Sequence, residues 1–328
     1  MKVLVTGATG FIGSFVAEYF ASQGFEVRCT IRKSSNLRWV KDRGYELVET
    51  DFNSPQNLKS AVVGVDYIAH IAGTIAAPDY NGYLKGNRDS TFNLLKALEL
   101  YNPSVKKFLY CSSQTAVGPA KSLSEPVDET TECHPITSYG QSKLEAEKEV
   151  LNFKDIFPVT IVRLPAIYGP RDTALVDMFR VVHKGIAPLI GFKERYLSLL
   201  HCDDAVEGLF LATVSDKSTN EIFFLSSEEF YSWSYLIDCM IKAVGRKAVK
   251  IRIPNSLVYT AGFLSEKIGK LLGKTPVFNL EKARDFTQDY WICSSKKAQE
   301  LLGFKQKVHP EEGFASTYRW YVQNGWIG

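Results

Sequence analysis

The fold is decided near the start of the chain, where residues 2–13 read Lys2-Val3-Leu4-Val5-Thr6-Gly7-Ala8-Thr9-Gly10-Phe11-Ile12-Gly13. A short apolar strand runs into three glycines spaced G-x-x-G-x-x-G, and an amphipathic helix pattern follows. A tight turn beside a diphosphate needs glycines, because side chains would block both the turn and the approach of the ligand oxygens. Glycine spacing alone also fits an ordinary turn, so the strand before it and the helix after it carry the interpretation. We predict a dinucleotide-binding loop whose contacts come from Gly7, Thr9, Gly10, Phe11, Ile12 and Gly13.

Outward from this loop, apolar strand-like runs alternate with helix-length segments through the first half of the chain. The runs cover residues 2–6, 26–31, 67–71, 107–111 and 159–164. Near-continuous apolar strands joined by crossover-length segments are typical of a doubly wound parallel sheet. The alternation breaks near Pro170 and returns only briefly later. The predicted fold class is α/β, with a dinucleotide-binding domain of residues 1–170 and 196–226 and a smaller, discontinuous α+β substrate lobe of residues 171–195 and 227–328.

The end of the second strand indicates which dinucleotide binds. An acidic side chain there would bond the adenosine ribose 2′-hydroxyl, whereas a basic one would accept a 2′-phosphate. The chain has no carboxylate in reach and offers Arg32, Lys33 and Ser35. A guanidinium fork suits a phosphate, so we predict NADP, with NAD as the second choice and a solvated strand end as the alternative. Asp51 and Phe52 are predicted to bond and cover the adenine, although a loop-capping Asp51 fits the same pattern.

Composition excludes several classes of protein. The 328 residues contain 39 Lys plus Arg and 36 Asp plus Glu, and a net charge of +3 argues against a nucleic-acid partner. The six cysteines include no C-x-x-C pair, so we expect neither a disulfide scaffold nor a metal site. No apolar run reaches the ~18 residues of a membrane span, and the N-terminal run is too short for a signal peptide. We expect a cytoplasmic protein with a small-molecule substrate and no integral membrane span.

A second group of residues has the make-up of a proton-transfer site. Tyr139 and Lys143 lie at i and i+4, on one face of a predicted helix of residues 139–153. A nearby ammonium favours phenolate, so Lys143 is expected to lower the pKa of Tyr139 toward the range useful for proton exchange. Ser113 ends a predicted parallel strand, where side chains face the ligand crevice. We predict Ser113, Tyr139 and Lys143 as catalytic residues; a surface helix pair beside a capping serine is the alternative.

With four more segments in order, the sequence resembles the extended short-chain dehydrogenases/reductases, also called the NAD-dependent epimerase/dehydratase family. The segments are His70-Ile71-Ala72-Gly73, Asn87 ahead of Thr91-Phe92-Asn93-Leu94-Leu95, Arg163-Leu164-Pro165-Ala166-Ile167-Tyr168-Gly169-Pro170, and His201-Cys202-Asp203-Asp204-Ala205. The resemblance covers nearly the whole chain and implies a Rossmann fold.

The same resemblance implies roles for individual residues. Tyr139 would be the acid/base, Lys143 would also bond the nicotinamide ribose, and Ser113 would polarise the substrate. Helices of about residues 86–101 and 139–153 would pair in a homodimer. Further cofactor contacts would come from Ile71, Ala72, Gly73, Pro165 and Ile167.

Differences within the family narrow the expected reaction. Sugar-nucleotide members carry Arg-Asp-Phe/Tyr before the His-x-x-Asp segment; here residues 197–200 are Leu-Ser-Leu-Leu, with Arg195 as a possible substitute. Gln114 and Thr115 stand where dehydratases have an Asp-Glu pair. The pattern is similar instead to dihydroflavonol reductases and 3β-hydroxysteroid dehydrogenases. We expect an NADP(H)-dependent oxidoreductase of an apolar or aromatic carbonyl or secondary alcohol. The alternatives are a nucleotide-sugar epimerase with tightly bound NAD and an NADPH-binding regulatory protein.

Two features of the second half lie outside these motifs. Residues 257–272 place apolar side chains at helical spacing beside lysines. We expect this amphipathic helix to pack on the substrate lobe, with a pocket lid or a membrane surface as the alternatives. Trp291 is expected to form a wall of the substrate pocket.

Overall fold

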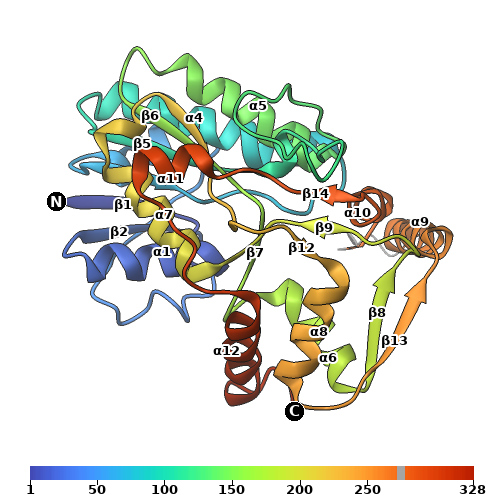
Figure 1. The fold of residues 1–328 in the computed structure, drawn as a ribbon. Coiled ribbons are helices and arrows are strands. Elements are labelled where there is room, and N and C mark those ends of the chain that lie inside the picture. Colours follow the sequence, from blue (N-terminus) through green and yellow to red (C-terminus); the bar gives the residue numbers. More distant parts are fainter. Residues whose placement is uncertain (272–277) are drawn as a thin grey trace.

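A parallel sheet of seven strands forms the centre of the computed structural model, which describes residues 1–271 and 278–328 (Figure 1). Its strands are β1 (Lys2–Thr6), β2 (Glu26–Ile31), β3 (Glu46–Glu49), β4 (Tyr67–His70), β5 (Lys107–Ser113), β6 (Val159–Leu164) and β11 (Glu221–Phe224). They are ordered β11-β6-β5-β4-β1-β2-β3, and each neighbouring pair is parallel. The strand order reverses between β1 and β4, where such sheets open a crevice at their carboxyl ends. The predicted α/β class with a doubly wound, Rossmann-type sheet is confirmed.

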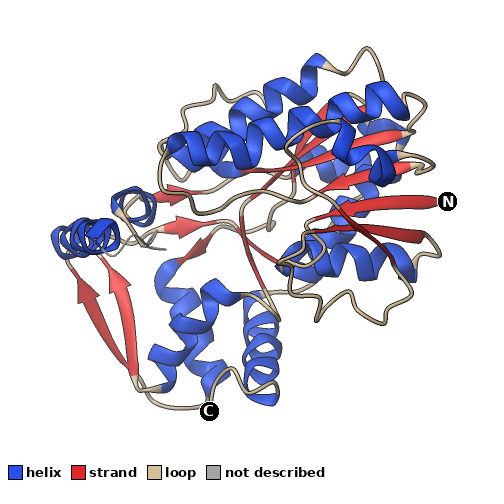
Figure 2. Ribbon diagram, turned by 180° about the vertical axis from the view of Figure 1, so that it is seen from behind, coloured by secondary structure: helices blue, strands red, loops and turns tan. Residues whose placement is uncertain are grey.

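Helices cover both faces of this sheet (Figure 2). One face carries α1 (Phe11–Ser22), α7 (Cys202–Val214) and α11 (Lys296–Leu302), and the other carries α2 (Lys59–Val62), α4 (Ser90–Tyr101) and α5 (Ser138–Asn152). Leu4 and Val5 are consecutive and fully buried, yet they belong to different core clusters. Successive side chains of a strand point to opposite faces, so burial on both faces explains the continuous apolar runs of the sequence.

The remaining elements pack beside the carboxyl ends of the sheet, around a core of their own. Helices α6 (Thr173–His183), α8 (Trp233–Val244) and α12 (Pro310–Gln323) share an apolar cluster that includes Phe179, Met240 and Tyr321. Three small sheets join them: β7 (Ala166–Tyr168) with β10 (Leu199–His201), β9 (Tyr196–Leu197) between β12 (Tyr231–Ser232) and β14 (Tyr290–Trp291), and β8 (Ile186–Ile190) with β13 (Val249–Ile253). The other described elements are α3 (Tyr80–Leu84), α9 (Asn255–Leu271), α10 (Leu280–Phe286) and short turns at Gln56–Leu58, Lys85–Asp89, Gln114–Ala116 and Asp216–Ser218. The division of the chain into domain and lobe stays a prediction.

The helix expected over residues 86–101 has two parts. Residues Lys85–Asp89 form a wider π-helical turn, and the regular helix α4 begins at Ser90. Gly86 packs so closely on Thr74 that any side chain at this glycine would overlap the threonine. This contact holds the π turn against the segment after β4, and such turns are frequent at functional sites.

Helix α9 corrects the expectation for residues 257–272, of which Leu272 lies outside the described residues. Val258 is buried, but the other large apolar side chains of the predicted stripe are more than half exposed, namely Leu257, Leu264, Ile268 and Leu271. The helix does contact α10, but the expectation that its apolar stripe makes such a contact is wrong. The helix instead turns Gly262 and Gly269 inward, together with Val258. Among the helices of the described ranges, none combines the length and apolar character needed to cross a membrane.

Candidate active site

One cavity of about 1410 Å³ runs along the carboxyl ends of the central strands and on into the lobe. We call the part beside the glycine loop and the ends of β2 and β3 its nucleotide end. We call the part lined by Leu175, Met178, Trp233, Phe286 and Trp291 its substrate end. Among the predicted site residues, Lys33 is exposed and lies outside this lining. The cavity lining contains the others: Gly7, Thr9, Gly10, Phe11, Ile12, Gly13, Arg32, Ser35, Asp51, Phe52, Ile71, Ala72, Gly73, Ser113, Tyr139, Lys143, Pro165 and Ile167.

The glycine loop has the geometry of a phosphate cradle. Gly7 has a φ of +72°, and an added Cβ would lie 2.8 Å from the Ala72 nitrogen. A side chain at Gly13 would overlap the Gly7 carbonyl oxygen. Gly10 caps α1 without a side-chain hydrogen bond, so the N–H groups of the first turn keep no capping partner and line the cavity. Unpartnered N–H groups at the positive end of a helix suit a diphosphate, and this loop therefore fits a dinucleotide.

The end of β2 presents one cation to the cavity. Arg32 and Ser35 line it and are tied together in a tight turn, with the Arg32 nitrogen 2.9 Å from the Ser35 hydroxyl. Arg38 stacks on Trp39 and Trp326, at 4.4 and 5.2 Å from the ring centroids. Although Arg38 is close to Arg32 in sequence, its guanidinium is thus committed to aromatic packing.

Asp51 lines the cavity and also caps its own loop. Its Oδ1 accepts hydrogen bonds from the Asn53 nitrogen at 2.9 Å and from the Asn57 side chain at 2.8 Å. These bonds hold the pKa of Asp51 below its usual range. The backbone of Phe52 is fixed in turn, because its carbonyl accepts a hydrogen bond from Asn93 at 2.7 Å.

A buried chain of hydrogen bonds links the glycine loop to α4. The Ala72 nitrogen donates to the Thr6 hydroxyl, which lies 2.7 Å from His70 Nδ1. On the other side of the ring, Nε2 lies 3.0 Å from the Thr91 hydroxyl, which donates to the Asn87 carbonyl. Complete burial lowers the pKa of His70 to about 3, so the ring stays neutral. The His70 motif therefore positions the cofactor loop rather than exchanging protons.

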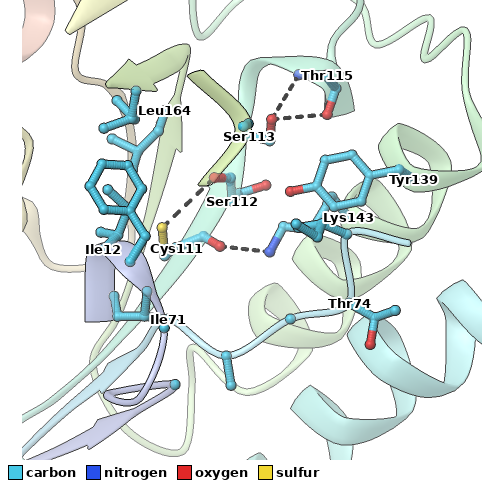
Figure 3. Close-up of a pocket in the computed structure, with 18 of the residues that line it drawn as sticks. Ile12, Ile71, Thr74, Cys111, Ser112, Ser113, Thr115, Tyr139, Lys143 and Leu164 are labelled. Carbon is cyan, nitrogen blue, oxygen red and sulfur yellow. Dashed lines mark hydrogen bonds between the residues drawn. The ribbon is translucent and has the colours of Figure 1, made fainter. Parts of the chain in front are cut away.

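Tyr139 stands at the start of α5 with its hydroxyl toward the end of β5 (Figure 3). Thr137 caps the N-terminus of the helix. Gly140, in the first turn, packs so closely on the segment after β5 that a side chain there would overlap the Thr115 carbonyl. This close packing brings Tyr139 to Ser113, whose hydroxyl accepts hydrogen bonds from the Thr115 nitrogen and hydroxyl at 3.2 and 2.9 Å. Burial raises the pKa of Tyr139, while a hydrogen bond with Ser113 acts in the opposite direction. The phenol is therefore protonated at neutral pH.

The ammonium of Lys143 does not act on Tyr139 in the way that the sequence predicts. Its Nζ donates to the Cys111 carbonyl at 2.6 Å and lies 4.2 Å from the centroid of the Tyr110 ring. Burial lowers the pKa of Lys143 to about 8. The expected lowering of the Tyr139 pKa is wrong for this structure, because burial dominates at the phenol and the ammonium is directed to a backbone carbonyl.

A buried ion pair anchors α5 one turn beyond Lys143. Glu147 receives hydrogen bonds from Arg163 Nε at 3.1 Å and Nη2 at 2.7 Å, and both side chains are at most 4% exposed. The Ser112 hydroxyl also donates to Glu147. The sequence interpretation assigned no role to Glu147. The available signal was an acid four residues after Lys143 together with an arginine inside an apolar strand.

The substrate end combines apolar walls with a few charged groups. Trp291 lines it as expected, and its indole N–H donates to the Asp285 carbonyl at 2.8 Å. Burial raises the pKa of Asp285, and it raises that of Asp172 to about 6. Lys282 lies 3.3 Å from the Asp285 carboxylate. Sequence analysis missed Asp172 and Asp285, because no local pattern connects these separate segments to one cavity.

Arg195 lines the cavity, but its guanidinium already has partners. It donates to the Ile190 carbonyl, to Asn255 Oδ1 at 2.9 Å and to the Thr287 carbonyl at 3.3 Å. The side chain is 7% exposed. Arg195 therefore ties together three segments of the lobe rather than presenting a free fork to a ligand.

One family model covers the segment that holds the glycine loop and the Ser113, Tyr139 and Lys143 group. The model of the NAD dependent epimerase/dehydratase family matches residues 3–226, which is more than half of the chain. The chain belongs to this family. The resemblance inferred from the sequence motifs is thus confirmed.

Members of the epimerase/dehydratase family that are similar to this chain have more than one kind of enzyme name. A ceramide reductase of Caulobacter vibrioides is 27% identical and covers 99% of this chain and 96% of its own length. A UDP-glucose 4-epimerase of Vibrio cholerae is 26% identical, with 98% and 96% covered. The crystal structure of gox2253 superposes with a TM-score of 0.82 at 29% identity, with 99% of both chains covered. The comparisons establish the family. Because the similar proteins include both a reductase and an epimerase, the reaction is inferred from the site.

Proposed function

We propose that this protein is an NADP(H)-dependent oxidoreductase that transfers a hydride between nicotinamide C4 and the carbonyl or secondary alcohol carbon of an apolar or aromatic substrate. One observation carries the proposal: Ser113, Tyr139 and Lys143 lie where the nucleotide end of the cavity meets its apolar substrate end. A proton donor at this junction can serve the substrate oxygen while the neighbouring carbon exchanges hydride with the cofactor.

The residues at the junction support a defined proton path. Ser113 accepts two hydrogen bonds from Thr115, so its own proton is the one it can donate. When the Ser113 hydroxyl donates its hydrogen bond to the Tyr139 oxygen, the phenolic O–H remains available to donate to the substrate oxygen. In the reducing direction the carbonyl carbon gains the hydride supplied by the bound cofactor and the oxygen gains the proton of Tyr139, which forms the alcohol. The phenolate then recovers a proton from water. Lys143, whose ammonium is directed to the Cys111 carbonyl, is proposed to bond the nicotinamide ribose instead.

NADP is the proposed cofactor because the end of β2 offers a cation and no acid. Arg32 and Ser35 line the cavity there. A guanidinium binds a phosphate in a bidentate manner. Lys33, which lies outside the lining, is not needed for this role, and Asp51 already caps its own loop.

The alternative with a specific observation in its favour is a nucleotide-sugar epimerase, because one similar relative is a UDP-glucose 4-epimerase. Such an enzyme needs a free cation for the substrate diphosphate. Arg195, the candidate for that cation, already donates to Ile190, Asn255 and Thr287. This arrangement, the apolar substrate end and the likeness to a ceramide reductase favour the apolar carbonyl substrate.

The test is an assay of NADPH oxidation at 340 nm over three groups of compounds: long-chain ketones, aromatic ketones and nucleotide sugars. The proposal expects turnover of an apolar ketone, with NADPH preferred over NADH. Interconversion of a UDP-sugar without net absorbance change, by enzyme that retains its cofactor through purification, would replace it with the epimerase. Tight NADPH binding with no turnover in any group would replace it with a regulatory protein. The homodimer and the cytoplasmic location stay predictions.

A further inference from the structure

Helix α9 has the opposite amphipathic arrangement from an ordinary surface helix. Its inward side carries Val258, Gly262 and Gly269, all buried. Gly262 sits so close to α10 that an added Cβ would be 2.8 Å from the Asn279 carbonyl oxygen. The outward side carries the large apolar side chains, with exposures of 58% for Leu257, 52% for Leu264, 56% for Ile268 and 86% for Leu271. Packing among the described residues, 1–271 and 278–328, therefore does not account for the large apolar side chains.

Aromatic side chains extend this exposed surface. Tyr259 is 38% exposed and Phe263 is 47% exposed. The ammonium of Lys267 lies 5.4 Å from the centroid of the Phe263 ring. A row of exposed leucine and isoleucine flanked by aromatic rings and a lysine has the composition of helices that lie in a membrane interface.

The sequence from the end of α8 through α9 is strongly basic, although the chain as a whole is nearly neutral. Residues 242–270 contain seven basic residues and a single acidic one, Glu266. The whole chain carries a net charge of only +3. The segment leading into α9 holds Arg246, Lys247, Lys250 and Arg252, all exposed. Lys250 pairs with Asp238 at 2.6 Å, and Arg252 donates to the Gly191 carbonyl at 3.1 Å. Strand β13 leads up to α9 (Figure 1), so the basic residues of this strand and Lys267 of the helix itself complement a surface that is both apolar and anionic.

The position of α9 connects this surface to the cavity. In both ribbon views α9 is an outermost element at the end of the molecule away from the N-terminus, with α10 beside it (Figures 1 and 2). Helix α10 lies against α9 on one side and supplies Lys282, Asp285 and Phe286 to the cavity lining on the other. Phe286 is itself 49% exposed. The substrate end therefore reaches the molecular surface one helix away from the apolar side of α9.

We propose that α9 docks this protein on an anionic lipid surface, with Leu257, Leu264, Ile268 and Leu271 inserted at the headgroup boundary. The charge argues for lipid over a second copy of the chain, because pairing α9 with itself would bring two cationic segments together. The docking does not require the proposed reaction. It adds to it a surface from which an apolar substrate can enter beside Phe286.

The experiment is cosedimentation of the full chain with vesicles of phosphatidylcholine, prepared with and without phosphatidylglycerol. We expect binding to the anionic vesicles that weakens as salt is added, and little binding to phosphatidylcholine alone. Leu264→Glu and Ile268→Glu should each weaken partitioning by about tenfold or more. Leu301→Glu is the matched control, because Leu301 is an exposed leucine of α11, at 39%, and its replacement should leave binding unchanged.

Two further measurements keep the outcome decisive. Hydrogen exchange of the unmodified protein should slow within residues 255–271 when anionic vesicles are added, which needs no variant to fold. Tyr139→Phe should bind vesicles like the unmodified protein, so failure of the proposed reaction would leave the docking result intact. Equal binding to both kinds of vesicle, no binding to either, or equal losses for Leu264→Glu and Leu301→Glu would overturn the proposal. So would a sedimentation-velocity result in which the α9 variants dissociate an oligomer while vesicle binding is unaffected.

Discussion

The two ends of the cavity are built from different parts of the chain and by different means. At the nucleotide end, three glycines within seven residues bring backbone N–H groups to the surface of the cavity, and Arg32 adds one cation. At the substrate end, large side chains arrive from four separate elements: Leu175 and Met178 from α6, Trp233 from α8, Phe286 from α10 and Trp291 from β14. Binding thus depends on backbone geometry at one end and on side-chain shape at the other. Ser113, Tyr139 and Lys143 join the two.

The largest effect expected is that of Tyr139→Phe, which should separate binding from reaction. Removal of the phenolic proton should lower kcat by about 10³-fold, while the glycine loop and Arg32 stay in place. Steady-state kinetics and NADPH titration of the same preparation check this prediction. If NADPH affinity fell in parallel with kcat, the junction would be part of the nucleotide end rather than the point at which the two ends meet.

Next in size is the loss of the ion pair that holds the junction. Glu147→Ala leaves the buried Arg163 guanidinium without its partner, and we expect a loss of about 3–5 kcal/mol in the free energy of unfolding. Denaturant unfolding measures it. Glu145→Ala, on the same helix but at a partly exposed pair with Lys148, is the control and should cost about 0.5 kcal/mol. Equal losses for the two variants would show that the Glu147 pair is not what anchors α5.

Lys143→Met should have opposite effects on activity and stability. Burial lowers the pKa of Lys143 from 10.5 to about 8, so the folded state gives up a proton more readily than the unfolded state. The cost of keeping the ammonium is full below pH 8, about 3 kcal/mol, and it disappears as pH rises from 8 to 10.5. The variant should therefore be more stable than the parent below pH 8, with the difference closing toward pH 10.5, while turnover is lost. A stability difference that is constant with pH would contradict this assignment.

Sequence patterns predicted the strand, glycine turn and helix of the nucleotide end because the determinants of these elements are local. The strand, the glycine spacing and the helix after them lie within one short segment, and Gly7 and Gly13 are required by contacts inside that segment and with Ala72. Sequence patterns failed where burial by distant parts of the chain decides how a side chain is directed or which side of a helix packs. The Lys143 ammonium is directed to the Cys111 carbonyl, which no spacing rule indicates. The periodicity of residues 257–272 indicated an apolar stripe on α9, but it did not indicate which side of the helix packs against the rest of the molecule. The substrate end left almost no local signal because its walls come from distant segments.

The smallest effect expected lies at the nucleotide end alone. Arg32→Ala should weaken NADPH binding by about tenfold, through loss of a charge-assisted bond to the 2′-phosphate, and should leave NADH binding unchanged. Lys33→Ala is the control, because Lys33 lies outside the cavity lining, and both affinities should stay the same. Calorimetric titration of the two cofactors decides the matter. Equal weakening of NADPH and NADH by Arg32→Ala would remove the reason for preferring NADP.

The most direct test of the central claim, that the two ends of one cavity meet at Tyr139 for hydride transfer, follows a deuterium label. NADPH carrying deuterium at both C4 positions is incubated with an apolar ketone and the protein, and the product alcohol is analysed by mass spectrometry. The account predicts one deuterium on the carbinol carbon with the unmodified protein and about 10³-fold slower labelling with Tyr139→Phe. Labelling that proceeds at an unchanged rate in Tyr139→Phe, or an alcohol without deuterium, would contradict it.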